Sequence, residues 1–296
     1  MKQYFYGEDR HGPYFEGWYF KCQTKDGFCI SFIPAMHINK AGEKSASLQI
    51  ITENRSWYLE YPFSSFSASV DVLDITLAGN CFSEAGICIN IEQEDLFLHG
   101  RIDFGTFNRL KSDIMGPVRL ISNMECVHCI VSMNHILNGK LKLEDRVFDF
   151  DGGLGYIEGD RGRSFPSSYL WSQCLWNDCS VFLSVAKITV AKLHFSGCIC
   201  VIKLNEREYR LATYRGSKIE NWSEKGVCLH QGRYRLEIHL LEQMMQHLRA
   251  PSSGDMKRTV QESVCAKVRY RFWKGNQLLL DRISSAASYE YSDSSK

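Results

Sequence analysis

The chain has 296 residues, of which 44% are hydrophobic, 12% aromatic and 23% charged. This is the composition of a globular protein with a sizeable core, and the length favours two domains. Lysine and arginine together number 35, against 34 aspartate and glutamate residues. Because there is no excess of positive charge, the composition argues against nucleic acid as a partner and leaves at most peripheral membrane contact.

We expect a cytoplasmic protein. The first residues, MKQYFYGEDRHG, carry charges where a secretion signal needs an apolar run. The longest apolar stretch, 181–202, is interrupted by Lys187, Lys192 and His194, so it does not predict a membrane helix. Twelve cysteines without an export signal are typical of reduced thiols in a cytoplasm.

Short runs rich in β-branched and aromatic residues follow one another, and Gly, Asn or Asp ends most of them. Several alternate apolar and polar residues with period two, as 264–272 does, which is typical of half-buried antiparallel strands. In chain order the predicted strands lie in 14–22, 27–34, 46–52, 57–63, 68–79, 87–105, 124–135, 180–190, 194–204, 208–216, 232–240 and 263–281.

Helices are scarce, so the predicted fold class is all-β, with strands at the spacing of barrels or sandwiches. The segment LLEQMMQHLRAP, 240–251, predicts at most a turn or two of helix before its proline. A turn at 138–140 predicts a boundary between two β domains, residues 1–139 and 140–283. Residues 284–296, SSAASYEYSDSSK, predict a polar tail that need not pack.

The CVHC motif at 126–129 raises the question of redox chemistry or zinc binding. Its flanks predict a strand, on which Cys126 and Cys129 point to opposite sides. The sequence has no second cysteine pair at zinc spacing. We therefore expect no metal site here, and we interpret these cysteines as small apolar residues.

Four segments of the chain resemble the tocopherol cyclase family and lie in the same order as in that family. They are GPYFEGWYFK (12–21), MECVHCIVSMNH (124–135), FDFDGGLGYIEGDRGRSFPSSYLWSQC (148–174) and LRAPSSGDMKRTVQES (248–263). The resemblance implies two lipocalin-like antiparallel β-barrel halves packed together, an architecture shared with carotenoid hydratases and Diels–Alderase-type proteins. It also implies a cofactor-free isomerase or intramolecular lyase that closes the chromanol ring of tocopherols from prenylated quinols.

Ring closure of a prenylated quinol adds a phenol oxygen across an alkene. The reaction needs a carboxylic acid that stays protonated at neutral pH through burial or a neighbouring carboxylate. It also needs aromatic faces to stabilise a cation, a polar group to deprotonate the phenol, and an apolar space for the isoprenoid tail.

The first predicted strand offers one candidate acid. Glu16 alternates with Tyr14 and Trp18 on one face, whereas Tyr19 lies on the other. A carboxylate between two aromatic residues is suited to shielding from water, so Glu16 is a candidate catalytic acid and Trp18 and Tyr19 are candidate substrate contacts. The alternative is that Glu16 pairs with an arginine at the rim and Trp18 is core.

The glycine-rich segment GYIEGDRGR offers a second acid. If it is extended, Tyr156, Glu158 and Asp160 share a face, with Asp160 as the acid or the residue that orients it and the other two as substrate contacts. The alternative is a salt-bridged turn of Asp160 with Arg161 and Arg163. Arg161 stands where the family has tryptophan, and a cation near the site favours an anionic or carbonyl-bearing ligand.

Five further candidates complete the predicted site. Trp171 and Gln173 share a face of the next strand and would line the pocket. His128 is a candidate base for the phenol. The alternative is a structural histidine in the core or at the rim, whose hydrogen bonds are made within the protein. Glu262 and Arg258 could complete a rim from the last strand, or form an interface salt bridge.

No motif for nucleotide or metal chemistry occurs in the sequence, and we expect no cofactor. The candidate residues favour an enzyme that cyclises, isomerises or hydrates a lipophilic small molecule, such as a prenylated quinol, another isoprenoid or a polyketide-like compound. The alternatives are a non-catalytic lipocalin-like binder or carrier of such a molecule, and a scaffold whose pocket has closed. The charged residues inside aromatic motifs favour the enzyme, because a carrier needs only an apolar cavity.

Overall fold

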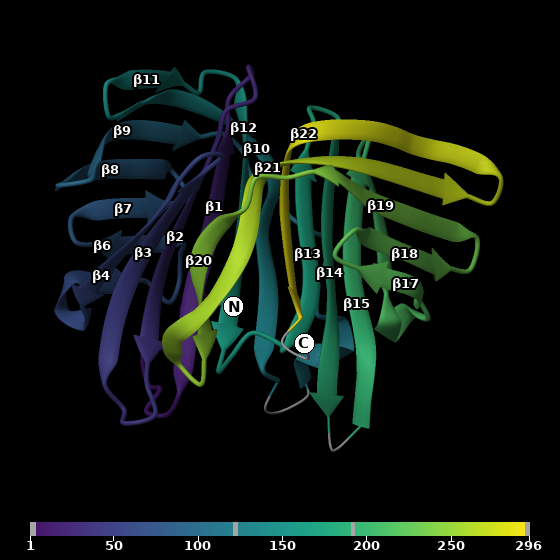
Figure 1. The fold of residues 1–296 in the computed structure, drawn as a ribbon, viewed down its shortest axis with the longest axis horizontal. Helices are drawn as coiled ribbons and strands as arrows, with labels where there is room; N and C mark the ends of the chain where they lie inside the picture. Colours follow the sequence, from purple (N-terminus) through teal and green to yellow (C-terminus); the bar gives the residue numbers. More distant parts are fainter. Residues whose placement is uncertain (1–3, 121–123, 191–192, 294–296) are drawn as a thin grey trace.

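The computed structural model describes residues 4–120, 124–190 and 193–293. Within these ranges almost all regular structure is β-strand, as the sequence predicts, and the short helical elements are the 3-10 turns Phe63–Ser65, Gly116–Leu120 and Thr213–Arg215. Two large antiparallel sheets lie side by side as two packed lipocalin-like halves (Figure 1). No helix in the described ranges has the length and apolar character needed to cross a membrane.

The first sheet has twelve strands in the order β4-β3-β2-β1-β12-β10-β9-β8-β7-β6-β5, with β11 paired to β10. Its strands are β1 (Tyr14–Gln23), β2 (Cys29–Ile38), β3 (Lys44–Thr52), β4 (Ser56–Pro62), β5 (Phe66–Ala68), β6 (Asp74–Leu77), β7 (Asn80–Ser83), β8 (Gly86–Gln93), β9 (Leu96–Phe104), β10 (Cys126–Leu143), β11 (Arg146–Asp149) and β12 (Gly153–Gly162).

The second sheet has ten strands in the order β16-β15-β14-β13-β22-β21-β19-β18-β17, with β20 paired to β21. Its strands are β13 (Ser168–Leu175), β14 (Cys179–Val190), β15 (Leu193–Leu204), β16 (Arg207–Ala212), β17 (Lys218–Ser223), β18 (Gly226–Gln231), β19 (Tyr234–Glu242), β20 (Gln246–Ser252), β21 (Asp255–Lys274) and β22 (Gln277–Asp293).

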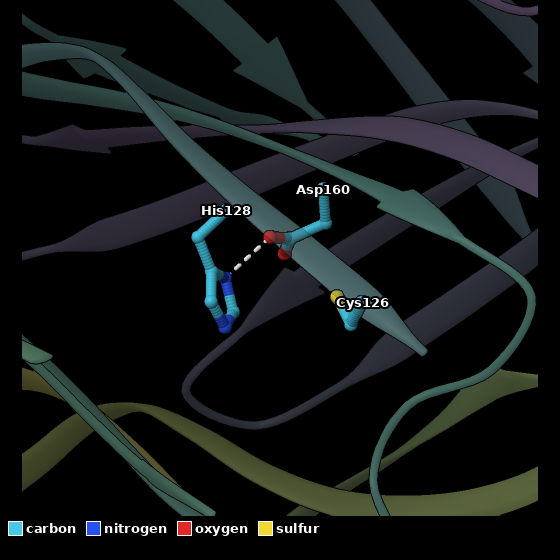
Figure 2. Close-up of side chains that lie close together, drawn as sticks. All are labelled: Cys126, His128 and Asp160. Carbon is cyan, nitrogen blue, oxygen red and sulfur yellow. Dashed lines mark ion pairs between the residues drawn. The ribbon is translucent and has the colours of Figure 1, made fainter. Parts of the chain in front are cut away.

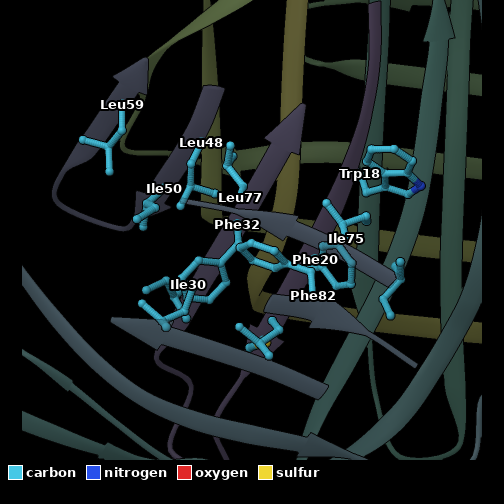
Figure 3. Close-up of a cluster of buried hydrophobic side chains, with 14 of the residues drawn as sticks. Trp18, Phe20, Ile30, Phe32, Leu48, Ile50, Leu59, Ile75, Leu77 and Phe82 are labelled. Carbon is cyan, nitrogen blue, oxygen red and sulfur yellow. The ribbon is translucent and has the colours of Figure 1, made fainter. Parts of the chain in front are cut away.

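The connection between the two edge strands forces the first sheet to curl. β4 ends at Pro62 and β5 begins at Phe66, so the chain can separate the two edges by only about 14 Å. The same strands laid flat would hold these edges about 50 Å apart. The sheet therefore curves round on itself, and its concave face encloses a core that includes Trp18, Phe20 and Phe32 (Figure 3).

The two halves also pack against each other. A separate hydrophobic cluster lies between the two sheets. It includes Tyr19, Tyr156 and Trp171, whose side chains point away from the core enclosed by their own sheet. The hairpin β20–β21 reaches from the second half onto the first (Figure 1). It is held there by Gln49, whose amide exchanges hydrogen bonds of 2.9 and 2.7 Å with the backbone of Arg249.

Three sequence predictions about organisation differ from the structure. The chain changes sheet between Gly162 and Ser168, so the boundary predicted after residue 139 falls inside β10. Residues 284–293 are not a tail, because they belong to β22, which pairs with β21 and, over residues 288–293, with β13; residues 294–296 lie outside the described ranges. The segment 240–251 contains the end of β19 and most of β20 rather than helical turns. Long-range strand pairing overrides weak local signals in each case.

Candidate active site

A cavity of about 900 Å³, including its open mouth, lies between the two halves. Residues from both sheets line it, and aromatic rings dominate the walls: Phe15, Tyr19, Phe165, Tyr169 and Trp171. A largely apolar hollow with a few convergent polar groups, between two structural units, is the usual form of a small-molecule site. The charged or polar side chains that line this cavity are His37, Gln49, His128, Glu158, Asp160, Ser184, Arg249, Glu262 and Glu290, beside the hydroxyl groups of its tyrosines.

β10 and β12 place a histidine and a carboxylate side by side. His128 and Asp160 are directly paired across the two strands, and His128 Nδ1 lies 2.5 Å from Asp160 Oδ1 (Figure 2). Burial by itself lowers the pKa of His128, but the Asp160 carboxylate outweighs burial and raises it to about 9. The Nε2 atom lies 3.3 Å from Ser184 Oγ on β14. At neutral pH this pair is therefore an imidazolium held by a carboxylate.

Cys126 lies next to this pair, and the three side chains together have the donor types of a metal site. Cys126 Sγ, His128 Nδ1 and an Asp160 oxygen all lie within 4.8 Å of one another (Figure 2). Two ligands of one tetrahedral zinc ion would be about 3.3 Å apart, whereas His128 Nδ1 and Asp160 Oδ1 lie only 2.5 Å apart, as an ion pair. Burial also raises the pKa of Cys126 well above its usual value, so without a metal ion this residue is a thiol. The observed arrangement fits an ion pair better than a metal centre.

Glutamates on three strands reach the cavity, and each accepts a hydrogen bond from a buried tyrosine. The pairs are Tyr156 with Glu158 on β12 (2.7 Å), Tyr19 on β1 with Glu262 on β21 (2.5 Å), and Tyr169 on β13 with Glu290 on β22. A tyrosine hydroxyl has one hydrogen to donate, so each pair engages one carboxyl oxygen of its glutamate.

Burial raises the pKa of all three glutamates. That of Glu158 rises to about 8 through burial and the nearby Asp160 carboxylate, and that of Glu290 rises to about 7 through burial. The pKa of Glu262 rises well above its usual value, because of burial and because Glu290 lies directly opposite on the paired strand. These shifts favour the protonated form of the three carboxyl groups, which share the cavity with the His128–Asp160 ion pair.

Trp171 and Gln173 lie on the same face of β13, as predicted, but only Trp171 lines the cavity. The Trp171 ring lies edge-on to Tyr19 at 5.2 Å, and its indole N–H points to Glu158 Oε2 at 3.4 Å. Gln173 is fully buried and does not line the cavity. Its amide atoms have no hydrogen-bond partner within the described residues.

Glu16, Trp18 and Arg161 lie on the other face of the first sheet. Both Glu16 carboxyl oxygens accept the Tyr6 backbone N–H, at 2.9 and 3.2 Å, and Tyr14 donates to Oε2 at 2.9 Å. The Arg161 guanidinium lies 3.8 Å above the Tyr6 ring. Successive residues of a strand point to opposite faces, so Arg161 is separated from Asp160 by the sheet itself. The expectation of a cation beside Asp160 is therefore wrong for Arg161, and the cation there is His128.

Glu16 is better placed to fix the N-terminal segment than to act in the cavity. Burial raises its pKa to about 7, but its partners are Tyr6 and Tyr14. We expect Glu16→Gln to lower the free energy of unfolding by about 1–2 kcal/mol, because one acceptor oxygen becomes a donor. Ligand binding to the cavity should not change. Urea unfolding and a ligand titration measure the two effects, and a variant that folds normally but loses binding would contradict this placement.

Two carboxyl groups of the cavity, those of Glu290 and Glu262, were not predicted to lie in it. Glu290 lies in the segment predicted to be a tail, although SYEY at 288–291 already alternates in the manner of a strand. Glu262 was a candidate for the rim, yet it is buried with 2% of its surface exposed and reaches the cavity. Its hydrogen-bond partner in the cavity, Tyr19, lies on a strand far away in the sequence. No local sequence pattern therefore indicates this contact.

A second hollow adjoins the first. It has a volume of about 1060 Å³ including open space, and Met115, Met124, Ile188 and Ile199 are among its mostly apolar lining residues. The two hollows share the wall formed by Cys126, His128, Pro166, Ser184 and Ala186. Glu158, Glu262 and Glu290 form the carboxyl cluster of the first hollow. A ligand whose polar head lies at this cluster therefore has apolar space next to it for a hydrocarbon tail.

No protein-family model matches the chain, and no curated protein matches it. Solved structures do match over nearly its whole length. The structure of CghA with Sch210972 aligns with a TM-score of 0.62 at 6% identity, over 95% of this chain and 88% of CghA. Kievitone hydratase from Nectria haematococca aligns with a TM-score of 0.58 at 9% identity, over 96% of this chain and 90% of that one.

An AttH candidate from Nitrosomonas europaea also aligns, with a TM-score of 0.55 at 10% identity, over 95% of this chain and 92% of that one. At such low identities the likeness concerns the fold. The chain thus has the two-half, lipocalin-like architecture of these proteins, one of which is a hydratase by name. The resemblance to tocopherol cyclases stays a prediction.

Proposed function

We propose that this protein is a cofactor-free acid–base enzyme that adds an oxygen nucleophile across a carbon–carbon double bond of a lipophilic small molecule. The observation that carries the proposal is the set of three buried, tyrosine-bound glutamates with raised pKa, in an apolar cavity that also contains the His128–Asp160 pair. Burying carboxyl groups costs free energy. A cavity that only carries an apolar molecule has no use for them.

Glu262 is the proposed acid. Burial and the facing Glu290 raise its pKa well above the usual range, which favours the protonated acid. Tyr19 donates to Oε1, which leaves Oε2 to hold the acid proton. Transfer of this proton to an alkene carbon breaks one O–H bond, forms one C–H bond and produces a cation. The faces of Trp171 and Tyr19 in the cavity wall supply negative electrostatic potential for that cation.

The Asp160 carboxylate is the proposed base, held in place by protonated His128. The nucleophile's oxygen forms a bond to the cationic carbon and gives its hydrogen to Asp160. One proton leaves Glu262 and one reaches Asp160, so the reaction needs no oxidant or reductant. An internal phenol oxygen gives ring closure, whereas water gives hydration.

The substrate class follows from the shape of the site and from the sequence. The adjoining apolar hollow supports a ligand with a hydrocarbon tail. The resemblance of four sequence segments to tocopherol cyclases favours a prenylated quinol or a related prenylated phenol and intramolecular attack. The fold shared with a protein named kievitone hydratase supports water as the second possible nucleophile.

Deuterium incorporation tests the proposal whichever product forms. The purified protein is incubated in D₂O with a panel of prenylated hydroquinones and phenols, with saturated-chain analogues as controls. Products are analysed by mass spectrometry, and native mass spectrometry records which compounds bind. We expect one carbon-bound deuterium in the product of an unsaturated compound and none in its saturated analogue. Tight binding of unsaturated compounds without any incorporation would support a carrier and contradict the enzyme.

A further inference from the structure

Lys21 is a buried cation that the proposed reaction does not use directly. Only 1% of its surface is exposed. Its ammonium group donates to Ala286 O at 2.6 Å and Ser288 Oγ at 2.9 Å, and no ion pair with a carboxylate is found for it among the described residues. An ammonium group removed from water without a carboxylate partner is costly to keep. It therefore calls for an explanation.

The hydrogen bonds of Lys21 lead to the proposed acid in a fixed direction. Ser288 Oγ lies 3.0 Å from Tyr19 Oη, and Tyr19 donates its hydrogen to Glu262 at 2.5 Å. Because Lys21 can only donate and the Tyr19 hydrogen is engaged, Ser288 must donate to Tyr19. The chain Lys21–Ser288–Tyr19–Glu262 thus has all its hydrogens directed at the carboxyl group, and such aligned bonds polarise one another.

We propose that Lys21 is a positioning residue that, through Ser288 and Tyr19, stabilises the carboxylate that Glu262 becomes once it has given up its proton. The inference rests on the proposed function, in which Glu262 is the acid. An ammonium group in direct contact would keep Glu262 ionised at rest. The hydroxyl groups of Ser288 and Tyr19 separate Lys21 from Glu262. Glu262 can therefore keep its proton at rest, and its carboxylate is still stabilised by the positive charge of Lys21.

The other groups around Glu262 make this contribution necessary. Burial, Glu290 and Glu158 all raise the pKa of Glu262, whereas Tyr19 and Lys21 lower it. Glu290 belongs to β22, which pairs with β21, and Glu158 belongs to β12 of the first sheet, so carboxyl groups from both sheets face Glu262. Without Lys21 the proton would be held more tightly. Lys21 is the cation that counteracts Glu290 and Glu158 at this carboxyl group.

Infrared spectroscopy of the full chain as a function of pH tests the inference without a substrate. The C=O band of protonated Glu262 is assigned by its absence in Glu262→Gln. We expect Lys21→Met to raise the pH at which this band disappears by about one unit or more. Ser288→Ala should shift it in the same direction, and Lys21→Arg should restore the wild-type titration. Lys25→Met removes an exposed charge nearby and should leave it unchanged.

Each outcome decides the inference. If Lys21→Met and Ser288→Ala both titrate like the wild type, or shift downward, Lys21 does not act on Glu262. If Lys21→Met fails to fold, Ser288→Ala and Lys21→Arg still test the chain of hydrogen bonds. Failure of the proposed function has a different signature: Glu262→Gln would keep its rate of deuterium incorporation, whatever the infrared titration shows.

Discussion

Glu262→Gln is expected to lower the rate of deuterium incorporation by about 10²–10⁴-fold, the usual contribution of a general acid. Glutamine has nearly the same shape and can still accept the Tyr19 hydrogen bond, but it has no acid proton to transfer. Asp160→Asn should lower the rate comparably, because an amide cannot take the proton of the nucleophile. Binding of the same compound, measured by native mass spectrometry, should remain in both variants.

The matched control is Glu16→Gln. Glu16 is also a buried glutamate with a raised pKa and a tyrosine partner, but it lies on the other face of the sheet. It should therefore keep the wild-type rate. Equal losses in Glu16→Gln and Glu262→Gln would mean that the effect comes from removing a buried carboxyl group in general. Unchanged rates in both Glu262→Gln and Asp160→Asn would exclude the proposed acid and base.

The free energy of unfolding is expected to fall as the pH rises from 6.5 to 9. Glu158, with a pKa raised to about 8, and His128, with a pKa raised to about 9, both hold their protons more tightly in the folded chain than in the unfolded one. The folded state therefore binds more protons in this window, and their contribution is lost as the pH approaches the folded pKa values. Glu158 alone should account for about 2 kcal/mol between pH 6.5 and 8.

Urea unfolding at several pH values measures this slope. His37 and His135 have lowered pKa values, about 4 and about 3, because they are buried, so their opposite effect is confined to pH below 6.5. Glu158→Gln should flatten the curve between pH 6.5 and 8, and the exposed control Glu60→Gln should not. A wild-type stability that is constant or rises across this range would show that the carboxyl cluster is ionised in the folded protein.

Much of the local structure could be predicted from residue alternation. The strand containing Glu158 and Asp160 points both side chains to one face, as period two requires, and the structure places both in the cavity. The same rule separated Tyr19 from Glu16 and Trp18. Glycine at 159, between the two carboxylates, is explained only by the partner strand, because a Cβ there would lie 3.2 Å from the Trp18 ring.

The sequence could not tell which face of each strand borders the cavity. The alternation of side chains along a strand is the same whether a face lies inside a curled sheet or between two sheets. Both Glu16 and Asp160 were therefore candidates for the acid. Burial of Glu16 within the first half and of Asp160 between the halves depends on how the sheets curl and pack. The apparent tail at 284–293 shows the same limit, because a polar strand becomes buried only when β13 and β21 flank it.

By itself, then, the sequence determined that this chain forms antiparallel strands and which side chains share a face, because backbone geometry makes alternation a local property. The tertiary structure decided that Glu158, Asp160, Glu262 and Glu290 meet in one cavity. It also decided that Lys21 approaches Glu262 through two hydroxyl groups. These groups come from β1, β12 and the β21–β22 hairpin, and more than a hundred residues separate the groups of one element from those of the next. Only the packing of two curled sheets brings them together and removes them from water.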